Sequence, residues 1–141
     1  MDSHFSLPGI RAISYVAANV LPDHIAYMRA SRIPIKLNIM QTSVPFVGEP
    51  TCETETTKVN KAKKQSTTLN FRCTQPLPED YALAFVVTDN NGQNWLIGQR
   101  EEPFPLVSCT QTFGVTDGDP SSLTVAVTFE ASEALIPIEM E

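Results

Sequence analysis

Histidine is the side chain best suited to acid–base chemistry near neutral pH, and this chain of 141 residues has two, His4 and His24. An imidazole that acts as a base or metal ligand needs partners, such as further ligands or a nucleophile. Neither histidine has carboxylate or thiol ligands near it at the spacing of a metal site, and no serine stands in a Gly-x-Ser-x-Gly pattern. We therefore predict no catalytic residue and no metal ligand here, although a dispersed Ser-His-acid triad stays open.

Carboxylates offer the second candidate chemistry. Glu101 and Glu102 are adjacent, so on a strand they would point to opposite faces, poorly placed to share a substrate as glycosidase carboxylates do. Asp117 and Asp119, with Asp89 as a candidate third ligand, supply too few oxygens for calcium, which takes six or more. We predict turns at these positions, with no cofactor and no enzymatic activity.

Three cysteines, Cys52, Cys73 and Cys109, form no Cys-x-x-Cys pair. An odd number of cysteines without a signal peptide predicts reduced thiols packed as small apolar groups. A hairpin symmetric about residues 58–64 would bring Cys52 and Cys73 close together. The reducing cytoplasm in which we expect the protein argues against a disulfide between them.

A cluster of lysines is the most distinctive functional feature, and it comprises Lys58, Lys61, Lys63 and Lys64. We predict that it forms the basic tip of a long hairpin. One interpretation is a solvated tip kept soluble by its charge. The other is docking against an acidic neighbour or a phosphate backbone. The net charge of −6 argues against general nucleic-acid binding.

Trp95 is the only tryptophan and suggests an alternative function. Together with loop carboxylates it could make the chain a small binding module for carbohydrate or another surface ligand. The competing interpretation is that Trp95 packs in the core, as aromatic side chains in apolar runs commonly do.

The elements that must position these residues are strands. The run 81–98 places an Asn-Asn-Gly turn between two apolar segments, the pattern of an antiparallel hairpin. Residues 33–40 and 123–129 alternate apolar and polar side chains, as half-buried strands do. Further strands are expected over 9–17, 51–59, 65–73, 106–113 and 134–138.

These elements predict an all-β fold, an antiparallel β-sandwich or small barrel of about eight strands. At most one short helix is expected, near residues 22–31, where Pro22 and Asp23 suit a helix start. Residues 1–8, with Phe5 and Leu7, are expected to form an N-terminal arm, and 9–141 a single domain. The expected core comprises Ile35, Leu37, Leu69, Phe71, Leu83, Phe85, Val87, Leu96, Val125, Val127 and Phe129.

Composition limits the setting of the protein. Hydrophobic residues make up 42% and charged residues 18%, globular values with charge on the low side, which suits a chain that buries surface against partners. The start lacks the basic residues of a signal peptide, and no apolar stretch reaches the ~18 residues of a membrane span. We expect no membrane association, and a protein made and used in the cytoplasm or leaving it in an assembly.

Three segments carry a resemblance: 7–11 (LPGIR), 44–50 (VPFVGEP) and 95–105 (WLIGQREEPFP). In these the chain resembles short, uncharacterised proteins encoded among the structural genes of tailed bacteriophages and prophages of gut bacteria. The resemblance implies a β-rich virion component of the neck, tail or baseplate, present in the host cytoplasm during assembly and then in the virion. Its implied partners are copies of itself and other virion proteins, and no catalytic residues come with it.

For such assembly we expect a ring or collar of several copies. The candidate contacts are the basic hairpin tip and the two ends of the chain, 1–8 and 134–141, which could clasp neighbours by strand addition. The alternative is a monomer whose ends cover its own sheet edges.

Overall fold

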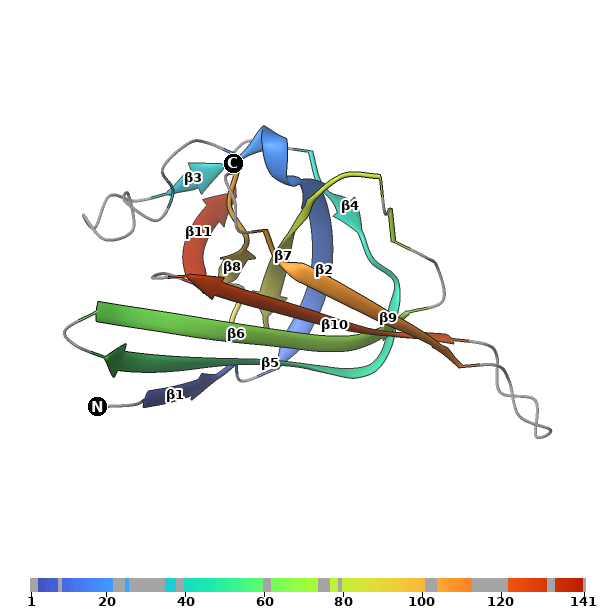
Figure 1. Cartoon of the computed structure of the whole chain (residues 1–141). Coiled ribbons are helices and arrows are strands. Elements are labelled where there is room, and N and C mark those ends of the chain that lie inside the picture. Colours follow the sequence, from blue (N-terminus) through green and yellow to red (C-terminus); the bar gives the residue numbers. More distant parts are fainter. Residues whose placement is uncertain are drawn as a thin grey trace.

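Two β-sheets packed face to face make up the part of the chain that the computed structural model describes (Figure 1). The described residues are 3–7, 9–21, 25, 35–37, 40–59, 62–73, 77–78, 80–100, 104–112, 122–131 and 134–140. The strands of one sheet run across those of the other, and the predicted sandwich, rather than the small barrel, is confirmed.

The first sheet, called sheet A, contains the longest strands. Its order is β1-β5-β6-β10-β9, and every neighbouring pair is antiparallel. Its strands are β1 (Ser3–Ser6), β5 (Phe46–Val59), β6 (Ala62–Cys73), β9 (Leu106–Thr112) and β10 (Ser122–Ala131).

The second sheet, called sheet B, has the order β3-β11-β8-β7-β2-β4. Its pairs are antiparallel except for β3 with β11. Its strands are β2 (Ile10–Ala17), β3 (Lys36–Leu37), β4 (Thr42–Ser43), β7 (Leu83–Asp89), β8 (Asn94–Ile97) and β11 (Ile136–Met140). Two of these strands have only two residues each, so the described part of the chain contains nine strands of four residues or more, against the eight or so expected.

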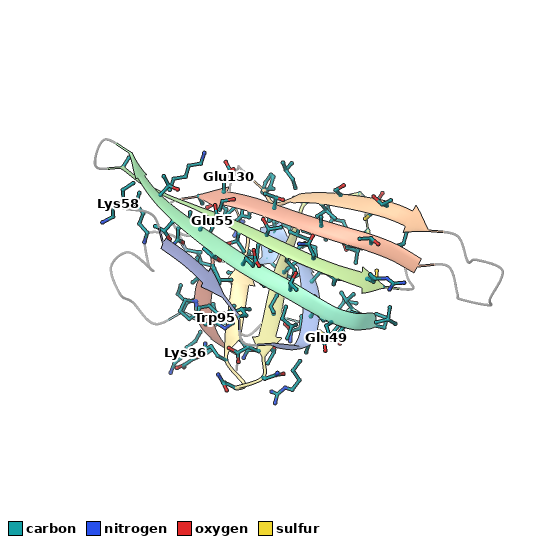
Figure 2. The ribbon with its side chains drawn as sticks, turned by 90° about the horizontal axis from the view of Figure 1, so that it is seen from below. Lys36, Glu49, Glu55, Lys58, Trp95 and Glu130 are labelled. Carbon is teal, nitrogen blue, oxygen red and sulfur yellow. The ribbon has the colours of Figure 1, made fainter. Side chains whose placement is uncertain are left out.

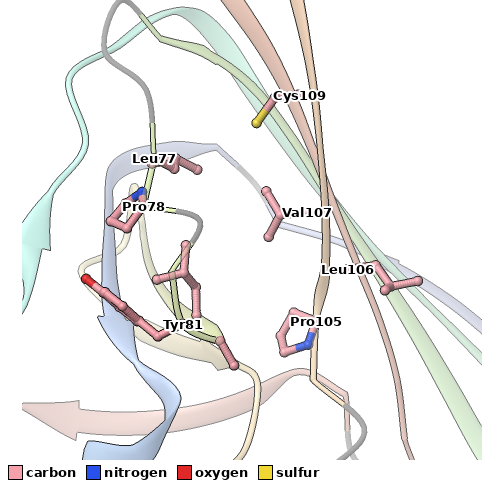
Figure 3. Close-up of a pocket in the computed structure, with 9 residues that line it drawn as sticks. Leu77, Pro78, Tyr81, Pro105, Leu106, Val107 and Cys109 are labelled. Carbon is pink, nitrogen blue, oxygen red and sulfur yellow. The ribbon is translucent and has the colours of Figure 1, made fainter.

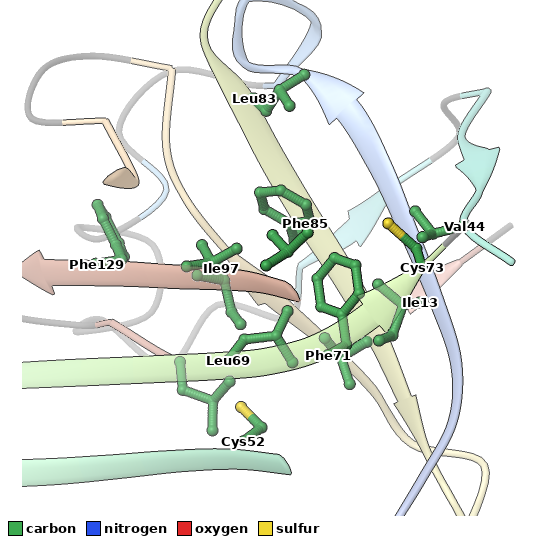
Figure 4. Packing of buried hydrophobic residues seen from close by; sticks show 14 of the residues in the cluster. Ile13, Val44, Cys52, Leu69, Phe71, Cys73, Leu83, Phe85, Ile97 and Phe129 are labelled. Atoms are coloured by element: carbon green, nitrogen blue, oxygen red, sulfur yellow. The ribbon is translucent and has the colours of Figure 1, made fainter. Parts of the chain in front are cut away.

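The main core lies between the two sheets, where alternate residues of facing strands meet (Figure 4). Phe71 from β6 and Phe85 from β7 bring their ring centroids to 6.5 Å. All the predicted core residues are buried except Leu37, whose side chain lies outside the described part of the structure. Leu123 and Phe129 share the inner face of β10, as their alternation predicts.

A second apolar cluster covers the opposite face of sheet B, and the sequence patterns did not predict it. Strand β7 is shared by the two clusters: Leu83, Phe85 and Val87 face sheet A, whereas Ala84 and Val86 face the other way. The second cluster consists of Val16, Leu21, Ile25, Ile35, Ala84, Val86, Leu96, Ile136 and Ile138. A strand buried on both faces has a continuous apolar sequence rather than an alternating one.

The hairpin of β5 and β6 is longer than expected, and its tip lies earlier in the chain. Val59 pairs with Ala62, so the strands are joined by residues 60 and 61 alone. Lys58, Lys63 and Lys64 therefore belong to the strands and not to a loop.

This register also separates two of the cysteines. Cys52 lies opposite Leu69, and beyond a register shift between Val47 and Thr51, Cys73 lies opposite Phe46. The proximity of Cys52 and Cys73 expected from a symmetric hairpin is wrong because the hairpin is centred between Val59 and Ala62, not midway between the two cysteines.

The predicted helix at 22–31 falls outside the described residues except for Ile25, which is buried. Within the described part of the chain, the short 3-10 turn η1 (Ala18–Val20) leads from β2 to buried Leu21.

The described residues at both ends of the chain pair with strands of the same chain. β1 runs along β5, and the Leu7 N–H donates to the Cys52 carbonyl at 3.1 Å. β11 lies between β8 and β3. In these residues the two ends of the chain pair with its own sheets. This is the arrangement of the alternative in which the ends cover the chain's own sheet edges, rather than that in which they clasp neighbours.

Candidate functional site

Asp89, the candidate calcium ligand, accepts hydrogen bonds from within the β7–β8 hairpin. It is 3% exposed, and its Oδ1 accepts hydrogen bonds from the backbone N–H groups of Asn91 at 2.9 Å and Gln93 at 3.0 Å. Gly92, at φ +85°, supplies the left-handed residue of this turn. Burial alone would raise the pKa of Asp89, but hydrogen bonds from Trp95, Gln93 and Asn91 and the charge of Arg11 hold it below its ordinary value.

Trp95 is half-buried and packs against the main core, and Figure 2 shows it on β8 in sheet B. Its indole N–H donates to Asp89 Oδ2 at 3.1 Å. This placement agrees with the packing interpretation. The ligand-stacking role of Trp95 stays a prediction.

The other candidates for chemistry are dispersed or undescribed. His4 lies in β1 opposite Glu55. The second histidine, both glutamates of the adjacent pair and two of the aspartates lie outside the described residues: His24, Glu101, Glu102, Asp117 and Asp119. Within the residues that the structure covers, no three His, Cys, Asp or Glu side chains gather as metal ligands. No helix among them is long and apolar enough to span a membrane.

The basic tip is built from paired strand positions. Lys58 lies near the end of the hairpin (Figure 2). It is directly opposite Lys63, and both are exposed. Lys64, on the other face, places its Nζ 3.1 Å from Glu130 Oε2 of β10. Lys61 is outside the described residues. The structure thus brings like charges together across the hairpin end, where they are exposed.

The inner face of this hairpin changes character along its length. The apolar pair Cys52 and Leu69 is followed by buried Thr54 and Thr67, whose hydroxyls are 3.0 Å apart. Next, Gln65 donates to the Thr56 hydroxyl at 3.2 Å and accepts from the Ala134 N–H at 2.8 Å. The core therefore gives way stepwise to polar contacts and then to lysines.

The two expected arm contacts lie in the chain's own sheet. Phe5 takes a register position opposite Thr54, and Leu7 is partly buried against the main core. Both positions pair with β5 of the same chain, and a contact of Phe5 or Leu7 with a neighbouring copy stays a prediction.

The strand expected over 106–113 is present as β9, but it is not among the candidate sites predicted from the sequence. It forms one edge of sheet A and pairs only with β10 in the described part of the chain. It has seven residues, none of them charged. Leu106 is 74% exposed and Val107 36%. Natural sheet edges are commonly protected by charge, proline, a bulge or shortness, and within β9 none of these is present.

A groove of about 380 Å³ lies beside this strand (Figure 3). Val107 and Cys109 point toward Leu77 and Pro78 on the far wall, whereas Leu106 points to the other side of β9. The side chains that line it are mostly apolar, while polar atoms of the same residues also face the groove, and the lining consists of Leu77, Pro78, Tyr81, Ala82, Leu83, Pro105, Leu106, Val107 and Cys109. A groove beside an open sheet edge can receive the side chains of an added strand.

The signal for this surface was present in the sequence. Seven uncharged residues follow two prolines, Pro103 and Pro105, in a chain with 18% charged residues. That pattern indicates a strand without the charged residues that commonly protect a sheet edge. Whether the strand lies at the centre or at the edge of a sheet depends on the order of the strands, which a local pattern does not determine.

The three thiols form no disulfide and differ sharply in exposure: Cys52 and Cys73 are buried and Cys109 is exposed. Burial, reinforced by the negative charge of Glu53, raises the pKa of Cys52 to about 12.

We expect a thiol reagent such as dithionitrobenzoate to modify exposed Cys109 of the native protein rapidly, and buried Cys52 and Cys73 only on unfolding. The thiolate is the reactive form, and burial both disfavours it and blocks the reagent. The measurement is the absorbance of released thionitrobenzoate over time. Cys109→Ser should abolish the rapid phase. A rapid phase that persists in this variant would show that a buried cysteine is accessible.

No family model, curated protein or solved structure matches this chain.

Proposed function

We propose that this chain is a non-enzymatic structural subunit that acts by protein–protein assembly. The observation that carries the proposal is the uncharged, exposed edge of β9 beside a groove lined mostly by apolar side chains. An edge strand presents unpaired backbone donors and acceptors, and an added strand satisfies them while its alternate side chains enter the groove.

The lengths of the edge strands and the charges beside them favour contact at β9 over contact at the other sheet edges. The opposite edge of sheet A is β1, four residues long, beside the acidic residues Glu53 and Glu55 of β5. The edges of sheet B, β3 and β4, have two residues each. A regular ladder of useful length is therefore available at β9 among the edges that the structure describes.

The sequence resemblance gives the proposal its setting. We infer a virion component of a tailed phage, in the neck, tail or baseplate, whose partners are its own copies and other virion proteins. It would be present in the host cytoplasm during assembly and afterwards in the virion. The lysines at the hairpin tip, with Lys58 and Lys63 exposed, would steer its approach to acidic partners.

The alternative, a carbohydrate- or surface-ligand-binding module, receives less support from the geometry. The indole N–H of Trp95 already donates its hydrogen bond to Asp89. The surface on which a ligand would stack is therefore limited to the exposed part of a half-buried ring.

The test is co-expression of a tagged chain with the structural proteins encoded beside it, followed by mass spectrometry of the purified complexes. We expect the chain to recover structural proteins, and Val107→Lys to reduce that recovery because a charge then stands at the groove. Val47→Lys is the matched control, since Val47 is 41% exposed on β5, which β6 and β10 separate from β9 in sheet A.

Circular dichroism establishes that both variants fold. Recovery of no structural protein by the unmodified chain would refute the assembly function. Equal recovery by folded Val107→Lys would show that β9 is not the surface used.

A further inference from the structure

We propose that β9 pairs antiparallel with β9 of a second copy of this chain, about a twofold axis that passes midway between the Cys109 residues of the two copies. This pairing rests on the proposed assembly function and names its first partner. It would join two copies of the five-stranded sheet A into one continuous sheet.

The regularity of β9 makes it a suitable template. It pairs with β10 without a register shift from Leu106 opposite Thr128 to Thr112 opposite Ser122. The strand is therefore straight enough to present an evenly spaced ladder on its outer side. Bulges and inward charges, which disrupt edge pairing, are absent from this strand.

The sequence of β9 favours a second copy over an arbitrary strand because it is compatible with itself. Cys109 is the central residue of the seven, so a twofold pairing at that point uses the full length of the strand. It sets Leu106 opposite Thr112, Val107 opposite Gln111 and Ser108 opposite Thr110. No pair contains a charge, whereas like charges placed opposite each other destabilise antiparallel strands.

The net charge of the chain strengthens this argument. Two copies that each carry −6 repel one another, so self-association is favoured where both surfaces lack charge. β9 is a surface of that kind, with exposed apolar side chains at Leu106 and Val107.

Side-chain directions fit the same pairing. Val107 lies opposite buried Val127 of β10, and Cys109 lies opposite buried Val125, so both share the inner face of that strand. Across the proposed twofold axis, the inner faces of both copies lie on the same side of the joined sheet. The exposed Val107 of each copy would then be covered diagonally by the other's Cys109.

Cys109 provides a direct probe of the axis. Opposed residues of antiparallel strands hold their Cβ atoms about 4.5–5.5 Å apart, close to the separation of a disulfide. Diamide, which takes two electrons and two protons from a pair of thiols, should link the two copies through Cys109. Buried Cys52 and Cys73 should not react, and Cys109→Ser should give no linked dimer.

The register is tested with charges at Ser108 and Thr110, both exposed on the outer face of β9. In the proposed pairing each of these residues faces the other in the second copy. The double variants Ser108→Lys/Thr110→Lys and Ser108→Glu/Thr110→Glu place like charges opposite each other twice. Ser108→Lys/Thr110→Glu places opposite charges there twice and is their matched control.

We expect sedimentation under reducing conditions to show a concentration-dependent dimer for the unmodified protein. Both like-charge variants should weaken it about tenfold or more, and the mixed variant should retain it. Because the two like-charge variants shift the net charge in opposite directions, a general charge effect would change them differently. The yield of the diamide-linked dimer should follow the same order.

A protein that stays monomeric and forms no Cys109 link overturns the pairing, as does a dimer equally stable in all three variants. The assembly function is judged separately. If the unmodified chain is monomeric but still recovers structural proteins in a manner sensitive to Val107→Lys, the function stands and the strand added to β9 comes from another protein.

Discussion

Replacing Asp89 with alanine is expected to lower the free energy of unfolding by about 3 kcal/mol or more, since hydrogen bonds to charged groups contribute about 1.5–3 kcal/mol each. The carboxylate accepts from the Trp95 indole and from two backbone N–H groups of the turn. Removing it leaves these donors without their acceptor in a part-buried site. Urea unfolding followed by tryptophan fluorescence measures the loss, and Trp95 is itself the reporter.

The pH dependence of this effect identifies its electrostatic part. Because the pKa of Asp89 in the folded state is lowered from its ordinary value of 3.8, the carboxylate stabilises the fold above that pH. The contribution disappears as the pH falls through the folded-state pKa. Asp89→Asn resembles the protonated acid, so the difference in unfolding free energy between this variant and the unmodified protein should shrink from neutral pH to below 3.8.

Glu139→Gln is the control for removing a carboxylate, since Glu139 makes a 3.8 Å contact with Lys36 and its side chain is 68% exposed. Its effect should stay within about 1 kcal/mol. A difference for Asp89→Asn that is constant with pH would mean that shape, rather than charge, accounts for the role of Asp89.

Replacing Gly98 with alanine is expected to cost about 3 kcal/mol, because two unfavourable effects combine. A Cβ at this buried position would lie 2.7 Å from the Cβ and 3.1 Å from the Cα of Ala84. Ala84 is fully buried in β7 and has little room to move. The backbone of Gly98 also has φ +131°, which residues with a side chain rarely adopt.

Two variants separate these effects. Gly48→Ala places a methyl group where nothing lies within 4 Å, at φ +76°, and so measures the conformational cost alone, about 1 kcal/mol. Adding Ala84→Gly to Gly98→Ala removes the close atom and should recover part of the loss. Thermal unfolding that placed Gly98→Ala level with Gly48→Ala would show that the methyl group is accommodated.

The sequence predicted the fold class because its strongest patterns are local. The Asn-Asn-Gly turn and the alternation over 123–129 depend on neighbouring residues, and both elements formed as expected. The buried residues of β6 and β10 followed from the same two-residue period.

Register and layer number were harder to predict because they depend on contacts distant in sequence. The lysines of 58–64 suggested a loop, yet the strands continue through Lys58 and Lys63, since paired backbone groups tolerate exposed charged side chains. The second apolar cluster was missed although Ala84 and Val86 carried its signal, since the five residues 83–87 of β7 are all apolar. The candidate site was missed for a related reason: an uncharged strand becomes an open edge only through the order of the sheet.

The burial of β7 on both faces has a consequence for how the molecule unfolds. Its side chains belong alternately to the core between the sheets and to the cluster formed with Leu21, Ile25 and Ile35. Loss of either set of contacts exposes apolar surface on the same backbone, so the outer layer and the sandwich are thermodynamically coupled. We expect them to melt together in one cooperative transition, with the same midpoint by far-ultraviolet circular dichroism and by fluorescence.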